Sequence, residues 1–178
     1  FLQSPADVDL QMLNEPLLEV ELTFRAKEDL QPSDTLEDLF HKVTVAGALE
    51  LPDARFVDWF PDLGKYNVMA DCAVGGLVVY GEEHDADSVF ENVDDAANVH
   101  AVLVKDGEKL KEGVSSEVLG NPFKSLQWLV QKLAEQGKAF TKGQMVSSGT
   151  FVLPPKLTAG KWEVEFDSGL GNVVVNAK

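Results

Sequence analysis

Within residues 17–25, the even positions Leu18, Val20, Leu22 and Phe24 are apolar, and the odd positions from Glu19 to Arg25 are polar. A period of two predicts a β-strand. Glu19 and Glu21 then project from the same face, because side chains two positions apart on a strand do so. Two neighbouring carboxylates repel each other. This face is therefore either solvated or in contact with a cation.

A second apolar run, residues 45–51, contains one acidic residue, Glu50. An ionised carboxylate in apolar surroundings costs on the order of several kcal/mol unless a partner compensates it. That partner is either Arg55 or a metal ion. Mg²⁺ is usually held by a few carboxylates together with water and substrate oxygens, so Glu19, Glu21 and Glu50 are candidate metal ligands. The three histidines and Cys72 are scattered, which argues against a zinc site.

The rest of the chain predicts short strands and one long helix. Asn121 is a favourable N-cap, Pro122 suits the first helical turn, and apolar residues recur at helical spacing from Phe123 to Leu133. A short helix is expected at 36–43, and the acidic stretch 82–95 predicts a surface loop or exposed edge. Further strands are expected at 45–51, 77–80, 99–104, 144–147, 162–166 and 172–176, with a hairpin turn at Asp106-Gly107. Together these elements predict a β-rich α+β domain.

The composition limits the class of protein. A chain of 178 residues with 44% hydrophobic content is long enough for one domain with a substantial core. A formal net charge of -15 argues against nucleic acid or anionic lipid as a partner. There is no apolar run long enough for a transmembrane helix. The chain opens at Phe1 rather than Met, so we expect processing or trimming of a longer precursor.

Four stretches, taken in their order and spacing, resemble the fumarylacetoacetate hydrolase superfamily. Within it they are similar to the hydratase and decarboxylase branch that handles 2-oxo-4-pentenoate-like acids. The stretches are EVELTF at 19–24, ALELPDAR at 48–55, LGNPFKSLQWL at 119–129 and KGQMVSSGT at 142–150. The resemblance implies one catalytic domain at 17–178, with mixed β-sheets rolled around the site and one long helix. Residues 1–16 are then an N-terminal remnant or extension.

The resemblance also implies roles for particular residues. In the family, the acids matching Glu19, Glu21 and Glu50 bind Mg²⁺ or Mn²⁺. The residues matching Ser148, Gly149 and Thr150 line the substrate pocket, although a plain strand-end turn would explain the same three residues.

Asp71 lies where relatives have an Asp followed by small polar residues. It is a candidate general base or an anchor for other site residues, or else a buried hydrogen-bond acceptor that holds its loop. With Thr150, it is a candidate catalytic residue. Cys72 and Val74 depart from the polar pattern of the family. Relatives also carry an N-terminal segment with a catalytic Lys, whereas no Lys precedes Lys27 here. We expect that this Lys is supplied by a removed segment or a partner, or that the standard chemistry has been lost.

The function implied by the resemblance is that of a divalent-metal-dependent hydratase, a lyase acting on a small 2-oxo or 2-hydroxy-dienoic acid such as 2-oxopent-4-enoate. One alternative keeps the metal but performs decarboxylation or C–C hydrolysis of an acylpyruvate. Another is a non-catalytic binding or assembly protein that retains the fold. The expected partners are a small 2-oxo acid and further copies of the chain, without nucleic acid or membrane. By resemblance, the expected compartment is the cytoplasm, and the start at Phe1 leaves an exported form as the alternative.

Overall fold

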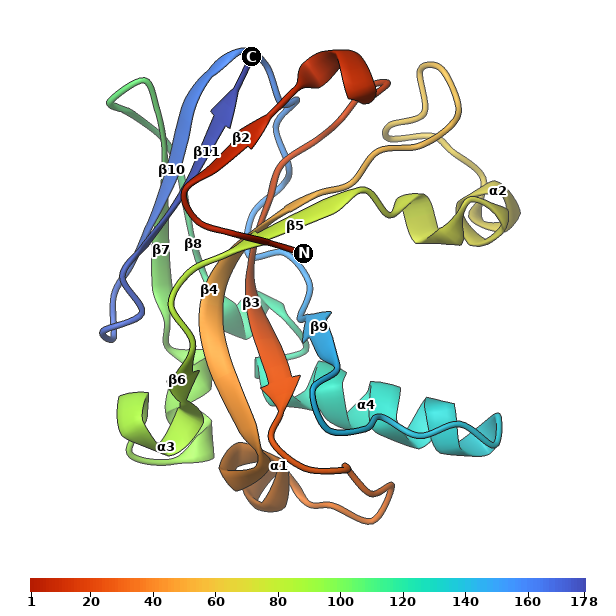
Figure 1. Cartoon of the computed structure of the whole chain (residues 1–178), viewed down its shortest axis with the longest axis vertical. Coiled ribbons are helices and arrows are strands. Elements are labelled where there is room, and N and C mark those ends of the chain that lie inside the picture. The colour runs from red at the N-terminus through yellow and green to blue at the C-terminus, as the bar shows by residue number, and fades with distance from the viewer.

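Two β-sheets packed face to face form the core of the computed structural model, which describes residues 1–178 (Figure 1). The first sheet contains, in spatial order, β1 (Leu2–Gln3), β5 (Leu77–Tyr80), β4 (Val43–Leu51), β3 (Glu19–Ala26) and β9 (Met145–Ser147), and β6 (His84–Asp85) also pairs with β4. The second sheet contains β2 (Ala6–Val8), β11 (Asn172–Ala177), β10 (Gly160–Phe166), β7 (His100–Lys105) and β8 (Glu108–Val114). Only β1–β5 and β2–β11 are parallel pairs. The sheets are therefore mixed, as predicted.

Helices cover one end of this sandwich, where Figure 1 shows α1, α3 and α4 beneath the sheets. They are α1 (Leu36–Lys42), α3 (Ala86–Val89) and α4 (Pro122–Glu135), while α2 (Lys65–Ala70) projects on an arm beyond β5. The predicted long helix is α4, and the Asn121 side chain accepts a hydrogen bond from the Phe123 amide at 2.9 Å. The Phe123 ring lies 4.7 Å from Phe24 of β3 and 5.9 Å from Phe40 of α1. These contacts attach α4 to the first sheet.

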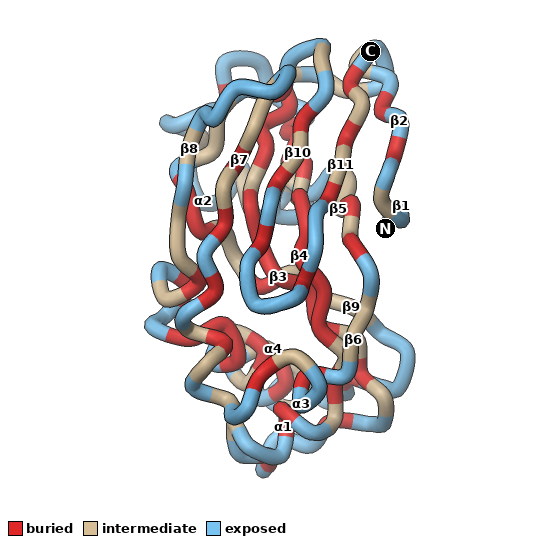
Figure 2. The backbone as a smooth tube through the Cα atoms, turned by 90° about the vertical axis from the view of Figure 1, so that its left-hand side faces the viewer, coloured by how far each residue is buried: buried red, intermediate tan, exposed pale blue.

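The outer face of the second sheet is solvated, whereas β3 of the first sheet is covered on both faces. Figure 2 shows buried positions alternating with intermediate or exposed ones along β7, β10 and β11. On β3, however, Glu21 and Thr23 are only 2% and 1% exposed. The interpretation of this polar face as solvated is therefore wrong for these two residues. Glu21 accepts a hydrogen bond from the Gly149 amide, and Thr23 Oγ1 donates to the carbonyl oxygen of Ala46.

Two further segments contain elements that the sequence did not predict. The acidic stretch 82–95 contains β6, α3 and the start of a 3₁₀ helix, Val93–Ala97. Side-chain hydrogen bonds stabilise this 3₁₀ helix locally, since Asn92 and Asp95 form a capping box at its start.

Residues 1–16 contribute β1 and β2, so they belong to both sheets. Strands of two and three residues are too short to leave a periodic signal. None of the helices combines the length and apolar character that a membrane-spanning helix needs.

Close approach of the two sheets depends on Gly47 of β4. A Cβ atom at this position would lie 2.4 Å from the Phe166 ring of β10. We therefore expect Gly47→Ala to lower the free energy of unfolding by about 1–3 kcal/mol, as overpacking of a core does. Urea denaturation monitored by tryptophan fluorescence measures this change. As a control, Gly64→Ser places a larger side chain where nothing lies within 4 Å and should leave the midpoint nearly unchanged. Equal midpoints for both variants would contradict the close-approach argument.

Candidate metal centre

The register of β3 and β4 brings the three predicted acids together. These strands are antiparallel, with Glu19 opposite Glu50 and Glu21 opposite Ala48. Glu21 lies two residues beyond Glu19 on the same face. Each of the three side chains offers a carboxylate oxygen within 4.8 Å of those of the other two. The arrangement depends on backbone hydrogen bonds of two buried strands, so the acids are held in place by a rigid part of the fold.

Burial and mutual repulsion disfavour the ionised forms of these acids. Burial, followed by the charge of Glu50, raises the pKa of Glu19 to about 7. The same two causes raise the pKa of Glu21 well above its ordinary value, against the opposing effect of a hydrogen bond from the Gly149 amide. No Lys or Arg side chain forms an ion pair with any of the three. Close, partly buried carboxylates without a cation form a suitable donor set for a divalent ion with oxygen ligands.

Arg55 is not the partner of Glu50, so this alternative is excluded. Its Nε donates to Asp71 Oδ1 at 2.8 Å, and its Nη1 donates to the carbonyl oxygens of Asp53 and Gly75 at 2.9 and 2.8 Å. The backbone amide of Arg55 donates to Asp71 Oδ2 at 3.2 Å. Asp71 therefore lies in a separate loop network and is not a member of the acid cluster.

The end of β9 and the turn after it supply hydrogen bonds to two of the acids. The Gly149 amide donates to Glu21 Oε2 at 2.7 Å, and Ser147 Oγ donates to Glu50 Oε2 at 2.5 Å. Ser147 was missed as a site residue. It faces Thr23 across the β3–β9 pair and therefore shares the face of the acids, but the sequence alone does not show which strands pair.

The neighbouring hydroxyl groups bind backbone atoms instead. Ser148 Oγ accepts from the Leu22 amide at 3.1 Å, and Thr150 Oγ1 accepts from the Val20 amide at 3.3 Å. Thr150 Oγ1 also donates to the carbonyl oxygen of Val152 at 3.0 Å. Of the three predicted pocket residues Ser148, Gly149 and Thr150, only Gly149 forms a hydrogen bond with an acid of the cluster.

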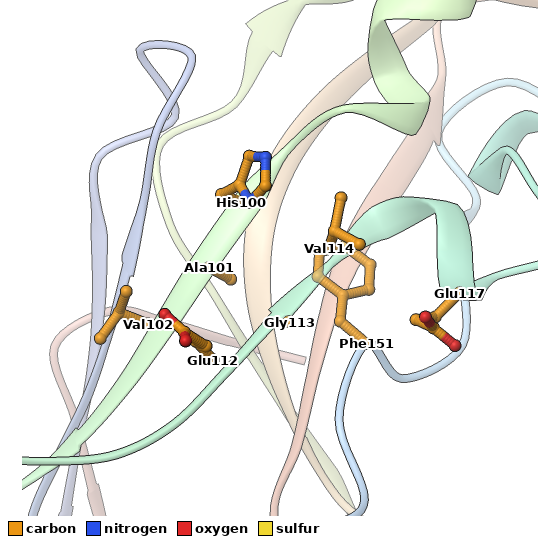
Figure 3. A pocket seen from close by; sticks show the side chains of 8 residues that line it. All are labelled: His100, Ala101, Val102, Glu112, Gly113, Val114, Glu117 and Phe151. Atoms are coloured by element: carbon orange, nitrogen blue, oxygen red, sulfur yellow. The ribbon is translucent and has the colours of Figure 1, made fainter.

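Two surface hollows lie near the segment that follows this turn. One, of about 310 Å³, lies beside β7 and β8 (Figure 3) and is lined by His100, Ala101, Val102, Glu112, Gly113, Val114, Glu117 and Phe151. The other, of about 300 Å³, is lined by Glu117, Thr150, Phe151, Val152, Leu153 and Pro154. Thr150 thus reaches a hollow, but none of the three clustered acids lines either one.

Known proteins resemble the chain in both sequence and fold. No protein-family model matches it. The 2-hydroxyhexa-2,4-dienoate hydratase of Comamonas testosteroni is 30% identical over 162 residues, which cover 89% of this chain and 59% of the hydratase. The 2-keto-4-pentenoate hydratase of Burkholderia vietnamiensis is 30% identical over 169 residues, which cover 92% of this chain and 61% of the hydratase. The chain thus spans about three fifths of the length of these relatives.

Among solved structures, 4-oxalocrotonate decarboxylase from Pseudomonas putida G7, complexed with magnesium and adipate, matches with a TM-score of 0.88 and 25% identity. The match covers 99% of this chain and 66% of the decarboxylase. Fumarylpyruvate hydrolase from Pseudomonas aeruginosa matches with a TM-score of 0.69 and 17% identity, over 99% of this chain and 69% of the hydrolase. The fold is therefore that of the fumarylacetoacetate hydrolase superfamily. In sequence and fold, the chain is similar to hydratases and a decarboxylase of the branch that its four sequence stretches predicted.

The raised pKa values predict how stability depends on pH. Consider a carboxyl group whose pKa is higher in the folded than in the unfolded protein. Its contribution to stability is complete at a pH below the pKa of the unfolded state. The contribution is lost as the pH rises through the pKa of the folded state. For Glu19 the window runs from the ordinary value of 4.5 to about 7, and the pKa of Glu21 shifts in the same direction. Without metal, the melting temperature should therefore fall between about pH 5 and pH 8.

Thermal melts in the presence of a chelator measure this dependence. Glu21→Gln removes one buried ionisable group and part of the repulsion, so its melting temperature should depend less on pH than that of the wild type. A wild-type melting temperature that stays constant or rises across this range would contradict the assigned directions.

Proposed function

We propose that the chain forms the metal-binding domain of a divalent-metal-dependent hydratase acting on a small 2-oxo or 2-hydroxy-dienoic acid such as 2-oxopent-4-enoate. The observation that carries the proposal is the cluster of Glu19, Glu21 and Glu50, with oxygens within 4.8 Å and no basic partner. Homology to proteins named as dienoate and pentenoate hydratases supports the substrate class. Magnesium in the decarboxylase structure supports Mg²⁺ as the ion, with Mn²⁺ as the alternative.

The three acids would hold the ion and limit the charge that it adds to the site. A bound Mg²⁺ or Mn²⁺ supplies positive charge that can stabilise an enolate oxygen and bind the carboxylate and 2-oxo oxygens of the substrate. The carboxylates offset that charge, while their fixed positions on β3 and β4 leave little reorganisation for the moment of binding. An acidic protein can in this way bind an acidic substrate.

Asp71 and Thr150 are the proposed residues for proton handling and substrate contact. Both oxygens of Asp71 accept hydrogen bonds from Arg55, so transfer of a proton to Asp71 would compete with these bonds. The Thr150 hydroxyl donates to the carbonyl oxygen of Val152 and would have to turn from it to donate to a substrate. Ser148 and Gly149 complete the proposed substrate-binding turn.

A second candidate reaction is decarboxylation of a related 2-oxo acid at the same metal. The TM-score of 0.88 to 4-oxalocrotonate decarboxylase favours it. The two reactions share the need to stabilise negative charge on the 2-oxo group, so the acid cluster serves either. The proposed assembly into a homo-oligomer applies to both candidates.

Metal binding should raise the stability of the folded chain. An ion that binds only the folded state adds about 2.7 kcal/mol when its concentration is 100 times its dissociation constant. We expect millimolar Mg²⁺ or Mn²⁺ to raise the melting temperature of the wild type at pH 8. Glu21→Ala should abolish this increase, because it removes a buried ligand.

The matched control for this measurement is Glu165→Ala, which removes an exposed acid from β10. This variant should keep the full metal-dependent increase. A wild type without any increase, or a Glu21→Ala protein with the same increase as the wild type, would refute the proposed ligand set.

Measuring which substrate the protein converts distinguishes the hydratase, the decarboxylase and the non-catalytic protein. The metal-loaded protein should consume 2-hydroxypenta-2,4-dienoate, seen as loss of the dienoate absorbance, and Glu50→Gln should reduce kcat/KM by at least about 100-fold through loss of charge at the ion. Release of CO₂ from 4-oxalocrotonate would instead identify the decarboxylase. Metal binding without turnover of any short 2-oxo acid would favour the non-catalytic alternative.

A further inference from the structure

Glu50 occupies a position that its charge alone does not favour. It lies directly opposite Glu19, and both Glu19 and Glu21 have carboxylate oxygens within 4.8 Å of its own. Arg55, the nearest cation in sequence, is bonded to Asp71. Glu50 is only partly buried, so part of this residue already meets water. Repulsion would be relieved if the carboxylate turned outward to water.

One hydrogen bond opposes this outward turn. Ser147 Oγ donates to Glu50 Oε2 at 2.5 Å, which is the only hydrogen bond to this carboxylate in the structure. Bonds this short between a hydroxyl and a carboxylate are charge-assisted and stronger than neutral ones. Ser147 lies on β9, which pairs with β3 on the side away from β4. Its hydroxyl therefore reaches across the strand that carries the other two acids and binds the third.

The hydrogen bonds that Ser147 of β9 and Gly149 of the following turn donate to the acids differ in kind. Glu21 receives its hydrogen bond from the backbone amide of Gly149, whose φ of +115° is one that L side chains rarely adopt. This donor is fixed by the backbone. The donor to Glu50 is a side chain, so a substitution can remove it while the strand pairing of β9 stays intact.

We propose that Ser147 is a positioning residue of the metal centre, which holds the Glu50 carboxylate beside Glu19 and Glu21 so that a divalent ion meets three ligands already in place. The inference rests on the proposed metal site. An ionised carboxylate has about four lone-pair sites, so one bond to Oε2 leaves Oε1 free to bind an ion. Loss of such a supporting hydrogen bond commonly weakens metal affinity by about 10–100-fold.

The test is direct binding of Mn²⁺ to the metal-free full chain, with free ion measured by electron paramagnetic resonance. Ser147→Ala should raise the dissociation constant by about 10–100-fold, while Ser147→Thr, which keeps a hydroxyl at the same position, should restore most of the affinity. Ser168→Ala is the matched control, because it removes another serine hydroxyl that donates to a carboxylate, that of Asp167 at 2.9 Å. This control should bind Mn²⁺ like the wild type.

The outcomes separate this inference from the proposed function. Wild-type affinity in Ser147→Ala would overturn the positioning role while leaving the metal site standing. A lower melting temperature of the metal-free Ser147→Ala protein with unchanged Mn²⁺ affinity would likewise assign Ser147 a purely structural role. Absence of Mn²⁺ binding by the wild type would overturn both proposals.

Discussion

Three carboxylates held close together by the pairing of two strands are the constraint on which the candidate site depends. The antiparallel register sets Glu19 against Glu50, and the pleat returns Glu21 to the same face. Their oxygens lie within 4.8 Å of each other, and burial with mutual repulsion raises the pKa of Glu19 and Glu21. Strand pairing and the hydrogen bonds from Ser147 and Gly149 thus maintain an arrangement that the three carboxylates themselves oppose. Under this condition a divalent cation stabilises a site.

The rest of the fold keeps these strands from relaxing. The second sheet packs closely against β4 because Gly47 has no side chain in front of the Phe166 ring. At the other end, the ring of Phe123 on α4 lies against Phe24 of β3. With both faces of β3 covered, the strands cannot separate to relieve the repulsion between the acids without opening the core. Sites built on such strands hold their ligands more exactly in place than sites on loops do.

Short-range signals accounted for the elements that the sequence predicted correctly. Asn121 and Pro122 mark the start of α4 through local capping, and Asp106-Gly107 marks the β7–β8 hairpin through turn geometry. Some contacts between residues distant in sequence were missed or left open. Arg55 binds Asp71 rather than Glu50, and β1 joins β5 more than seventy residues away. Neither the ion pair nor the strand pair leaves a periodic pattern in the sequence.

By itself, the sequence determined which residues can serve as ligands. The alternation around Glu19 and Glu21, the apolar run around Glu50 and the four stretches shared with relatives indicated an acidic site in a β-rich domain. Only the tertiary structure decided how that site is supported, including the contacts of Ser147 with Glu50 and of Gly149 with Glu21. The physical reason is that periodicity sets the face on which a side chain lies, whereas strand register, which depends on packing across the whole chain, sets what lies beside it.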